Sequence, residues 1–213
     1  MHDHDDEPAR RGENGLPDHE HLLRFWFGDA ATDAAAAARR MATWFEASDA
    51  YDSACRSAFA DWPERARRDE FEAWRATPRG ALALVLTLDQ LPRNLFRGTA
   101  RAFACDAAAV DVATDAVSRG FDRVLAPIEA SFLYLPFEHA ESVVLQERSV
   151  VLFEALETRA PATLAEVFAG FVDFARRHRD VIVRFGRFPH RNAALDRTST
   201  ADEEAWLAEG NRF

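Results

Sequence analysis

The sequence contains no lysine, so its 26 Lys and Arg residues are all arginine. This absence excludes Schiff-base catalysis, pyridoxal-phosphate anchoring and a Walker-type phosphate loop, because each needs a lysine amine. The 9 glycines never form Gly-x-Gly, and no serine lies in Gly-x-Ser-x-Gly. The dinucleotide-binding fingerprint and the nucleophile elbow are therefore absent as well.

Cysteine and long apolar runs are also scarce. Cys55 and Cys105 are the 2 cysteines of the chain, and their spacing is not that of a metal site. The longest apolar runs, such as residues 81–88, are far shorter than the roughly 20 residues that cross a bilayer, and no apolar signal region opens the sequence. We expect a cytoplasmic protein with no membrane partner, no resident metal and no cofactor.

The negative charge of the chain is concentrated at its N-terminus. The chain has 36 acidic and 26 basic residues, a net charge of −10, and residues 1–20 contribute seven acids and two arginines, or −5. The remainder lacks the broad basic face that nucleic-acid binding needs, so we expect no nucleic-acid partner. Residues 1–17 have the composition of a disordered acidic tail, and residues 18–213 are predicted to form one helical domain.

The rest of the sequence favours helices over strands. It contains many alanines and only two isoleucines, with few alternating valines. The patterns predict an all-α, single-domain array of about nine to eleven helices joined by short loops. The expected helices are one capped by Asp18 and ending at Gly28, one capped by Ser48, and those at 65–76, 78–91, 106–119 (stopped by Gly120), 137–157, 162–177 and 201–209.

Three stretches place more polar groups among apolar neighbours than a plain core needs. The first, residues 88–98, runs from an apolar helix into Asp89 and Gln90, and Pro92 disrupts the backbone there. Freed carbonyl groups are expected to be satisfied by Arg93, Asn94 or Arg97, and Asp89 is expected to pair with Arg93. This stretch is either a structural network that fixes a bend or part of a ligand site; the ligand-site hypothesis assigns it Asp89, Arg93, Asn94 and Arg97.

The second stretch, residues 132–146, is expected to start a helix at Pro136. On that helix His139, Ser142 and Gln146 share a face, and Glu138 and Glu141 share a neighbouring one. A general-base or metal-ligand role for His139 with Glu138 or Glu141 is then geometrically available, with His178 or His190 from elsewhere. The alternative is that the acids complement the helix dipole and the histidine is hydrogen-bonded in the core.

The third stretch, residues 176–197, holds seven arginines and two aspartates, a charge of +5 in an acidic protein. Guanidinium groups beside Phe185 and Phe188 suit bidentate recognition of a carboxylate or phosphate. The candidate ligand-binding residues here are Arg184, Arg187, His190, Arg191 and Asn192, with Gln146 from the second stretch. The alternative is that these arginines neutralise Asp89, Glu138 and Glu141 in one buried polar cluster.

These stretches carry a family resemblance. Taken together, the segments 25–28 (FWFG), 44–45 (WF), 88–98, 136–141 with Gln146, and 184–192 resemble the domain-of-unknown-function 924 family of bacterial proteins, over about residues 18 to 210. Leu91 and Ala140 depart from the Phe and Ser usual in that family, and the polar groups are intact. The resemblance implies an all-helical fold similar to tetratricopeptide arrays, and it implies no reaction.

Three functional hypotheses follow. In the first, the protein is a helical binding module whose arginine-lined central pocket takes a small anionic molecule or an acidic peptide end. In the second, it is a hydrolase or metal-assisted enzyme that uses His139 with Glu138 or Glu141. In the third, it is an interaction scaffold whose polar core is purely structural, and the tryptophans Trp26, Trp44, Trp62 and Trp74 are packing residues.

Overall fold

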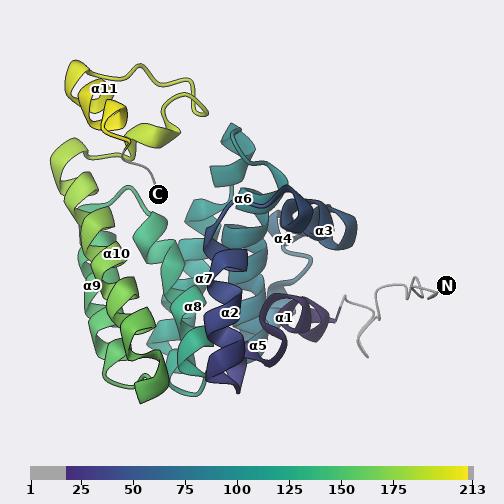
Figure 1. Cartoon of the computed structure of the whole chain (residues 1–213). Coiled ribbons are helices and arrows are strands. Elements are labelled where there is room, and N and C mark those ends of the chain that lie inside the picture. The colour runs from purple at the N-terminus through teal and green to yellow at the C-terminus, as the bar shows by residue number, and fades with distance from the viewer. Residues whose placement is uncertain (1–17, 211–213) are drawn as a thin grey trace.

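The computed structural model describes residues 18–210, and within that range every regular element is helical (Figure 1). This confirms the prediction of an all-α array, whereas its likeness to tetratricopeptide arrays stays a prediction. The predicted tail at residues 1–17 lies outside the described residues. The helices are α1 (His19–Phe27), α2 (Ala34–Phe45), α3 (Asp49–Phe59), α4 (Trp62–Arg67), α5 (Pro78–Val85), α6 (Leu91–Leu95), α7 (Asp106–Ser118), α8 (Pro127–His139), α9 (Val143–Glu157), α10 (Ala165–Phe185) and α11 (Ala201–Ala208).

Side-chain caps begin several helices where the sequence predicts them. Asp18 accepts a hydrogen bond from the backbone N–H of Glu20, and Ser48 accepts one from Tyr51. Thr200 and Glu203 form the reciprocal capping box of α11. After α7, Gly120 adopts a left-handed conformation with φ 73°, which a side chain would strain. These local signals position the helix ends without tertiary information.

Two predicted helix boundaries are wrong for local reasons. The expected helix at 65–76 is broken, because Asp69 adopts φ 59° between the end of α4 and a 3₁₀ turn at Glu72–Ala76. Aspartate tolerates this left-handed conformation better than most residues. The expected helix at 162–177 begins with a 3₁₀ turn, and α10 then continues to Phe185, where Gly186 with φ 71° ends it.

Helix α8 is the centre of the molecule, and its position corrects a third prediction. It begins at Pro127 and contains Pro136 in its interior, whereas the sequence suggested that Pro136 starts a helix running to residue 157. The chain leaves α8 after His139, and α9 begins only at Val143 with Ser142 as its N-cap. The shared helical faces predicted for residues 138–146 therefore do not exist. Residues 128–138 are all buried, as in a helix packed on every side.

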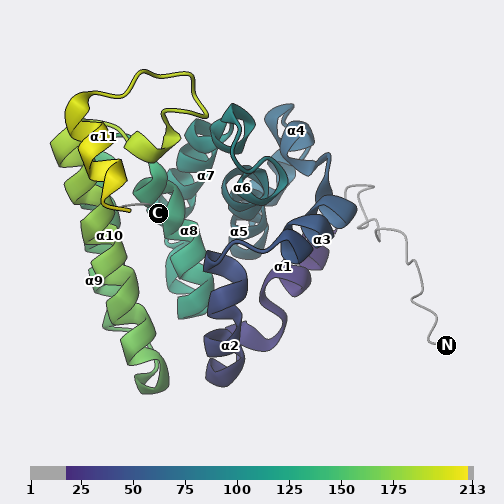
Figure 2. The ribbon, with the colours of Figure 1, turned by 45° about the horizontal axis from the view of Figure 1, so that its top comes forward.

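The core is one large cluster with a smaller one beside it. Aromatic rings fill the large cluster, including the four tryptophans predicted as packing residues, all of which are buried. Val181, Ile182, Phe188 and Trp206 form the smaller one between the end of α10 and α11. Figure 2 shows the segment after α10 passing over the top of the bundle before it reaches α11. Phe188 in this segment donates its N–H to Glu141, which lies just past the C-terminal end of α8.

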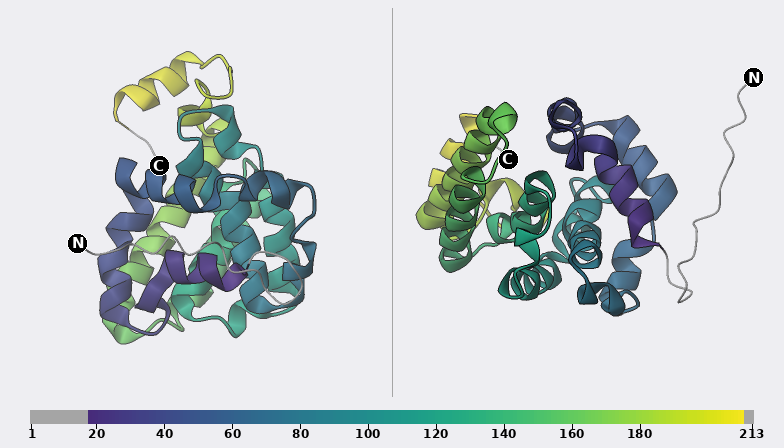
Figure 3. Two further views of the ribbon diagram at one scale, coloured as in Figure 1. Left: turned by 90° about the vertical axis from the view of Figure 1, so that its right-hand side faces the viewer. Right: turned by 90° about the horizontal axis from the view of Figure 1, so that it is seen from below.

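Seen from below, the α9–α10 pair and the N-terminal helices stand on opposite sides of the molecule, as Figure 3 shows on its right. Both free cysteines are buried, in agreement with a packing role. None of the helices between residues 18 and 210 is long and apolar enough to cross a membrane. The division into tail and single domain stays a prediction.

Candidate functional site

The site begins with a distortion next to α6. Proline 92 has no N–H, and its ring would collide with the carbonyl group one turn earlier, so the helix widens into a π-helical turn at Leu86–Gln90. The N–H of Leu91 accordingly bonds five residues back, to the carbonyl of Leu86. Asp89 lies on this turn and is fully buried. As predicted for this stretch, Arg93 donates to the Asp89 carbonyl at 2.7 Å, and it also pairs with the Asp89 carboxylate at 3.2 Å.

The end of α8 brings His139 onto that carboxylate. Nδ1 of His139 lies 2.8 Å and 3.0 Å from the two carboxylate oxygens of Asp89, and Gln90 donates to the same carboxylate at 2.6 Å. The partner of His139 is thus Asp89, and neither Glu138 nor Glu141 takes that place. Because the carboxylate accepts from Nδ1–H, the Nε2 atom of His139 is left as a base. The His139 side chain keeps 15% of its surface exposed.

A second buried carboxyl–imidazole pair lies beside the first. Nδ1 of His178 on α10 donates to the carbonyl of Phe174 at 2.9 Å and lies 3.5 Å from the Glu138 carboxyl. The rings of His139 and His178 have their centroids 6.4 Å apart. Two neighbouring residues of α8, Glu138 and His139, therefore serve two different pairs.

Two guanidinium groups share the carboxylate of Asp106 at the start of α7. Arg93 lies 3.0 Å from it and Arg191 3.2 Å. Arg191 comes from the segment after α10 and is 5% exposed, with its guanidinium against the rings of Phe103 and Phe188. Its Nε has no hydrogen-bond partner among residues 18–210. Residues from all three polar stretches thus meet in what we call the central cluster: Asp89, Arg93, Asp106, Glu138, His139, His178 and Arg191.

Burial and neighbouring charges set the protonation states of the central cluster. Although burial disfavours its charge, Asp89 has a pKa held well below the ordinary value by Arg93 and His139. Burial and Arg93 lower the pKa of His139 against the opposing effect of Asp89, and burial lowers that of His178 well below normal. Burial, with the Arg93 charge, lowers the pKa of Arg191 to about 10. Near neutral pH the imidazoles are therefore uncharged and Asp89 is ionised.

Glu138 behaves in the opposite way to Asp89. Burial, helped by the Asp89 charge, raises the pKa of its carboxyl to about 8 from the ordinary 4.5. No arginine pairs with it among the described residues, in contrast to the sequence-based alternative in which the arginines neutralise Glu138. Glu138 is therefore a protonated acid beside an ionised one, the divergence of two carboxyl pKa values that separates an acid from a base.

This raised pKa makes a prediction about stability and pH. The folded state keeps the Glu138 proton up to about pH 8, whereas the unfolded state loses it near pH 4.5. The contribution of Glu138 to the free energy of unfolding is therefore full below pH 4.5 and is lost as pH rises from there to about 8. Glu138→Gln resembles the protonated form and does not titrate. We expect its free energy of unfolding, relative to wild type, to rise by up to about 1.4 kcal/mol per pH unit between those values.

Urea unfolding at pH 5, 6, 7 and 8 measures that difference. The exposed Glu157 on α9 supplies the control, because Glu157→Gln makes the same chemical change at the surface of the protein. A constant difference for Glu138→Gln would contradict the assignment of Glu138 as a protonated group.

Three further candidates lie next to the central cluster with partners of their own. Glu141 accepts from the Phe188 N–H at 2.8 Å and pairs with Arg197 at 2.7 Å. Gln146 donates to the carbonyl groups of Glu138 and Ala140 and so fixes the chain where it leaves α8. Burial and Arg191 lower the pKa of His190 to about 4. Glu141 and Gln146 thus support the geometry of the site.

Asn94 and Arg97 lie away from the central cluster. Both donate to Asp52 on α3, Asn94 at 2.8 Å and Arg97 through two nitrogens at 2.8 Å each. This contact joins α3 to α6. The structure therefore corrects their placement in one pocket with Arg93, because a carboxylate 42 residues earlier in the chain already takes their hydrogen bonds.

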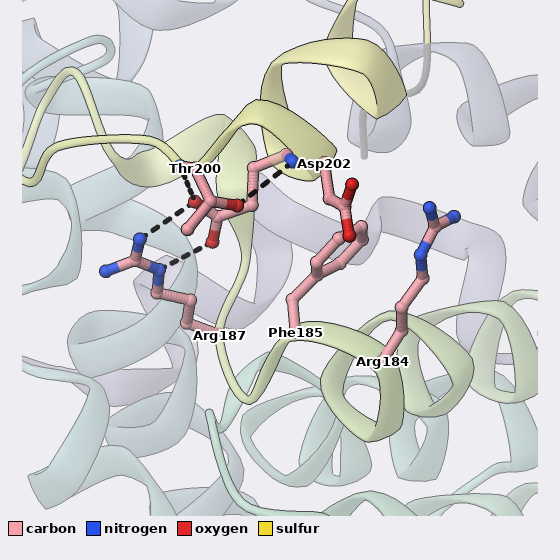
Figure 4. A pocket seen from close by; sticks show the side chains of 6 residues that line it. Arg184, Phe185, Arg187, Thr200 and Asp202 are labelled. Carbon is pink, nitrogen blue, oxygen red and sulfur yellow. Dashed lines mark hydrogen bonds and ion pairs between the residues drawn. The ribbon is translucent and has the colours of Figure 1, made fainter.

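Arg184, Arg187 and Asn192 also lie elsewhere. Arg184 and Arg187 line a surface pocket of about 410 Å³ between α10 and α11, shown in Figure 4. Arg187 donates to both carboxylate oxygens of Glu203 at 2.6 Å and 2.8 Å, and Asn192 donates to Ser199 at 3.0 Å. The predicted single arginine-lined pocket thus divides into this surface pocket and the central cluster.

Sequence reasoning missed the arginine pairings of three carboxylates: Asp106, Asp52 and Glu203. Each lies at or near the start of a helix, where an acid is expected for dipole reasons alone. No local signal distinguishes an acid that also pairs with a distant arginine. Within residues 18–210 no group of three or more His, Cys, Asp or Glu side chains is arranged to hold a metal ion.

The fold and site define an all-helical protein with a buried cluster of acidic, basic and imidazole groups. The chain belongs to the family described as bacterial protein of unknown function (DUF924), whose model matches residues 22–211. It is also similar to a solved structure, a protein of unknown function, ATU0120, from Agrobacterium tumefaciens. The two share 36% sequence identity and a TM-score of 0.76, over 90% of this chain and 97% of that one. No match was found among curated proteins.

Proposed function

We propose that this protein is a hydrolase that acts on a small anionic substrate, with His139 as its general base. The observation that carries the proposal is the contact of 2.8 Å between Nδ1 of His139 and the fully buried Asp89 carboxylate. A buried carboxylate fixes both the tautomer and the orientation of an imidazole, as general-base catalysis requires. The lowered pKa of His139 keeps Nε2 unprotonated near neutral pH, ready to take a proton from water.

The catalytic step needs only groups of this chain and water. His139 removes a proton from a water molecule while the water oxygen bonds to the electrophilic carbon or phosphorus of the substrate. The bond to the leaving group breaks, and the proton passes from His139 to that group. Arg93 pairs with Asp89, and Arg191 shares the Asp106 carboxylate with Arg93. Both are cations that would attract the negative charge developing on the substrate oxygen. The metal-assisted form of the hypothesis is not needed for this step.

The charges of the central cluster indicate that an anion would bind together with a proton. Arg93 and Arg191 contribute +2, Asp89 and Asp106 contribute −2, and the buried imidazoles are neutral, so the central cluster carries no net charge. An anion bound against Arg191 would leave a buried negative charge unless an imidazole other than that of His139, which stays the base, became protonated. We therefore expect anion binding to be accompanied by proton uptake. The partner-less Nε of Arg191 is a donor that such an anion would satisfy.

Thermal unfolding and calorimetry with inorganic phosphate and acetate test the binding step. We expect either anion to raise the melting temperature of the wild type, and calorimetry in buffers of different ionisation enthalpy to show uptake of up to one proton per anion at pH 7. Arg191→Gln is expected to abolish the shift while the protein still folds. The control is Arg39→Gln, which removes an exposed arginine of α2 and should leave the shift unchanged.

Each outcome separates the hypotheses. An equal shift in Arg191→Gln would place the anion elsewhere, with the surface pocket at Arg184 as the next site to test. If Arg191→Gln cannot fold, or if no anion shifts the wild type, the central cluster is structural and the protein is an interaction scaffold.

A further inference from the structure

Two exposed phenylalanines are joined by ring contacts to other aromatic residues of the fold. Most phenylalanines among residues 18–210 are buried or half-buried, but Phe45 at the end of α2 is 47% exposed and Phe174 on α10 is 45% exposed. Phe171 connects them, since its ring lies 5.8 Å from that of Phe45 and it precedes Phe174 by one helical turn. We call Phe45, Phe171 and Phe174 the aromatic strip.

The aromatic strip leads into the central cluster through His178. The ring centroids of Phe174 and His178 are 5.9 Å apart, and those of His178 and His139 are 6.4 Å apart. His178 also contacts Phe188 at 5.5 Å, and Phe188 lies against the Arg191 guanidinium. Apolar surface, the general base and the anion-binding arginine are thus joined by a continuous series of ring contacts.

Exposed aromatic surface costs free energy in water, and Phe45 and Phe174 are large enough for a ligand to bury a useful area. Resting on the proposed function, we propose that the substrate is derived from an organic acid whose anionic group lies against Arg191 beside His139, and whose apolar tail lies along the aromatic strip. This ligand class follows from the order in which Arg191, His139 and the aromatic strip are joined. The charged end meets the cation of the central cluster, and the tail extends toward Phe45.

This substrate class differs from a simple inorganic anion in its dependence on chain length. On this proposal a two-carbon acid binds only at the arginine, and a longer acid is expected to contact Phe174 first and Phe45 next. Each methylene that becomes buried on the strip is expected to lower Kd up to about fourfold, the equivalent of about 0.8 kcal/mol. The arginine contact is the same for every member of the series.

Calorimetry with acetate, butanoate, hexanoate, octanoate and decanoate tests the proposal. In the wild type we expect Kd to fall steeply once the tail is long enough to contact the strip. Phe174→Ala and Phe45→Ala should flatten that dependence and leave acetate binding unchanged, whereas Arg191→Gln should weaken every member by the same factor. Val151→Ala, which removes an exposed apolar side chain of α9, is the matched control and should keep the wild-type dependence.

The results distinguish this inference from the proposed function beneath it. If acetate binds at Arg191 but chain length has no effect, or has the same effect in Phe174→Ala as in the wild type, the aromatic strip does not bind the substrate and the anion site still stands. If no carboxylate binds, the proposed function itself fails. Melting temperatures of the two phenylalanine variants verify that each is folded before its binding is compared.

Discussion

Replacing His139 with glutamine is expected to lower the rate of hydrolysis by about 10²- to 10⁴-fold, the usual contribution of a positioned general base. Glutamine can still donate to the Asp89 carboxylate, so the fold and the anion contact with Arg191 should persist. Only the Nε2 base is removed. Nitrophenyl acetate, nitrophenyl hexanoate and nitrophenyl phosphate are suitable probes, because release of nitrophenol reports both acyl and phosphoryl transfer.

A second histidine gives the matched control for this prediction. His19→Gln changes a partly exposed imidazole on α1, far along the chain from the central cluster, and should retain the wild-type rate. Anion binding by His139→Gln, measured as for the wild type, shows whether the site is intact. An unchanged rate in His139→Gln would remove the catalytic role of His139, and the absence of hydrolysis of all three probes by the wild type would leave an anion-binding protein.

Local sequence signals were sufficient where a helix end depends on its own residues. The caps at Asp18, Ser48 and Thr200 and the left-handed Gly120 are short-range features, and all are present in the structure. Pro136 shows the limit of this reasoning. A proline often begins a helix but can also lie in the interior of a helix that is packed on all sides, and only the burial of α8 distinguishes the two cases.

The sequence predicts which polar stretches form the candidate site, but it does not predict which carboxylate each arginine pairs with. The polar stretches stand out because Asp89, Glu138 and Arg191 occur among apolar neighbours, and the structure brings these three into the central cluster. Which carboxylate each arginine meets depends on helix packing, with 85 residues between Arg191 and Asp106. For this reason Arg97 and Arg187 resemble Arg191 in sequence and lie at other places in the fold.

The difference between the two buried carboxyls Asp89 and Glu138 leads to the largest expected change in stability. Asp89 is ionised and accepts from Arg93, His139 and Gln90, so Asp89→Asn leaves the half-buried Arg93 with Asp106 as its remaining carboxylate. Loss of one partner from a buried ion pair costs about 3–5 kcal/mol. We expect Asp89→Asn to lower the free energy of unfolding by about 3 kcal/mol at pH 6, because Arg93 keeps one partner.

Glu138→Gln is the matched comparison, since it makes the same chemical change at a carboxyl that is equally buried. Its carboxyl is protonated in the folded state at pH 6, whereas in the unfolded wild type it is ionised. The substitution therefore replaces one neutral group with another in the fold and is expected to raise the free energy of unfolding at pH 6 by up to about 2 kcal/mol. Urea unfolding of both variants at pH 6 measures the two values under one condition. Equal losses would show that burial alone, and not the charge carried by Asp89, determines how these carboxyls stabilise the fold. A large loss confined to Asp89→Asn would establish Asp89 as the ionised group that both holds Arg93 and orients His139, so that one carboxylate links the stability of the central cluster to its chemistry.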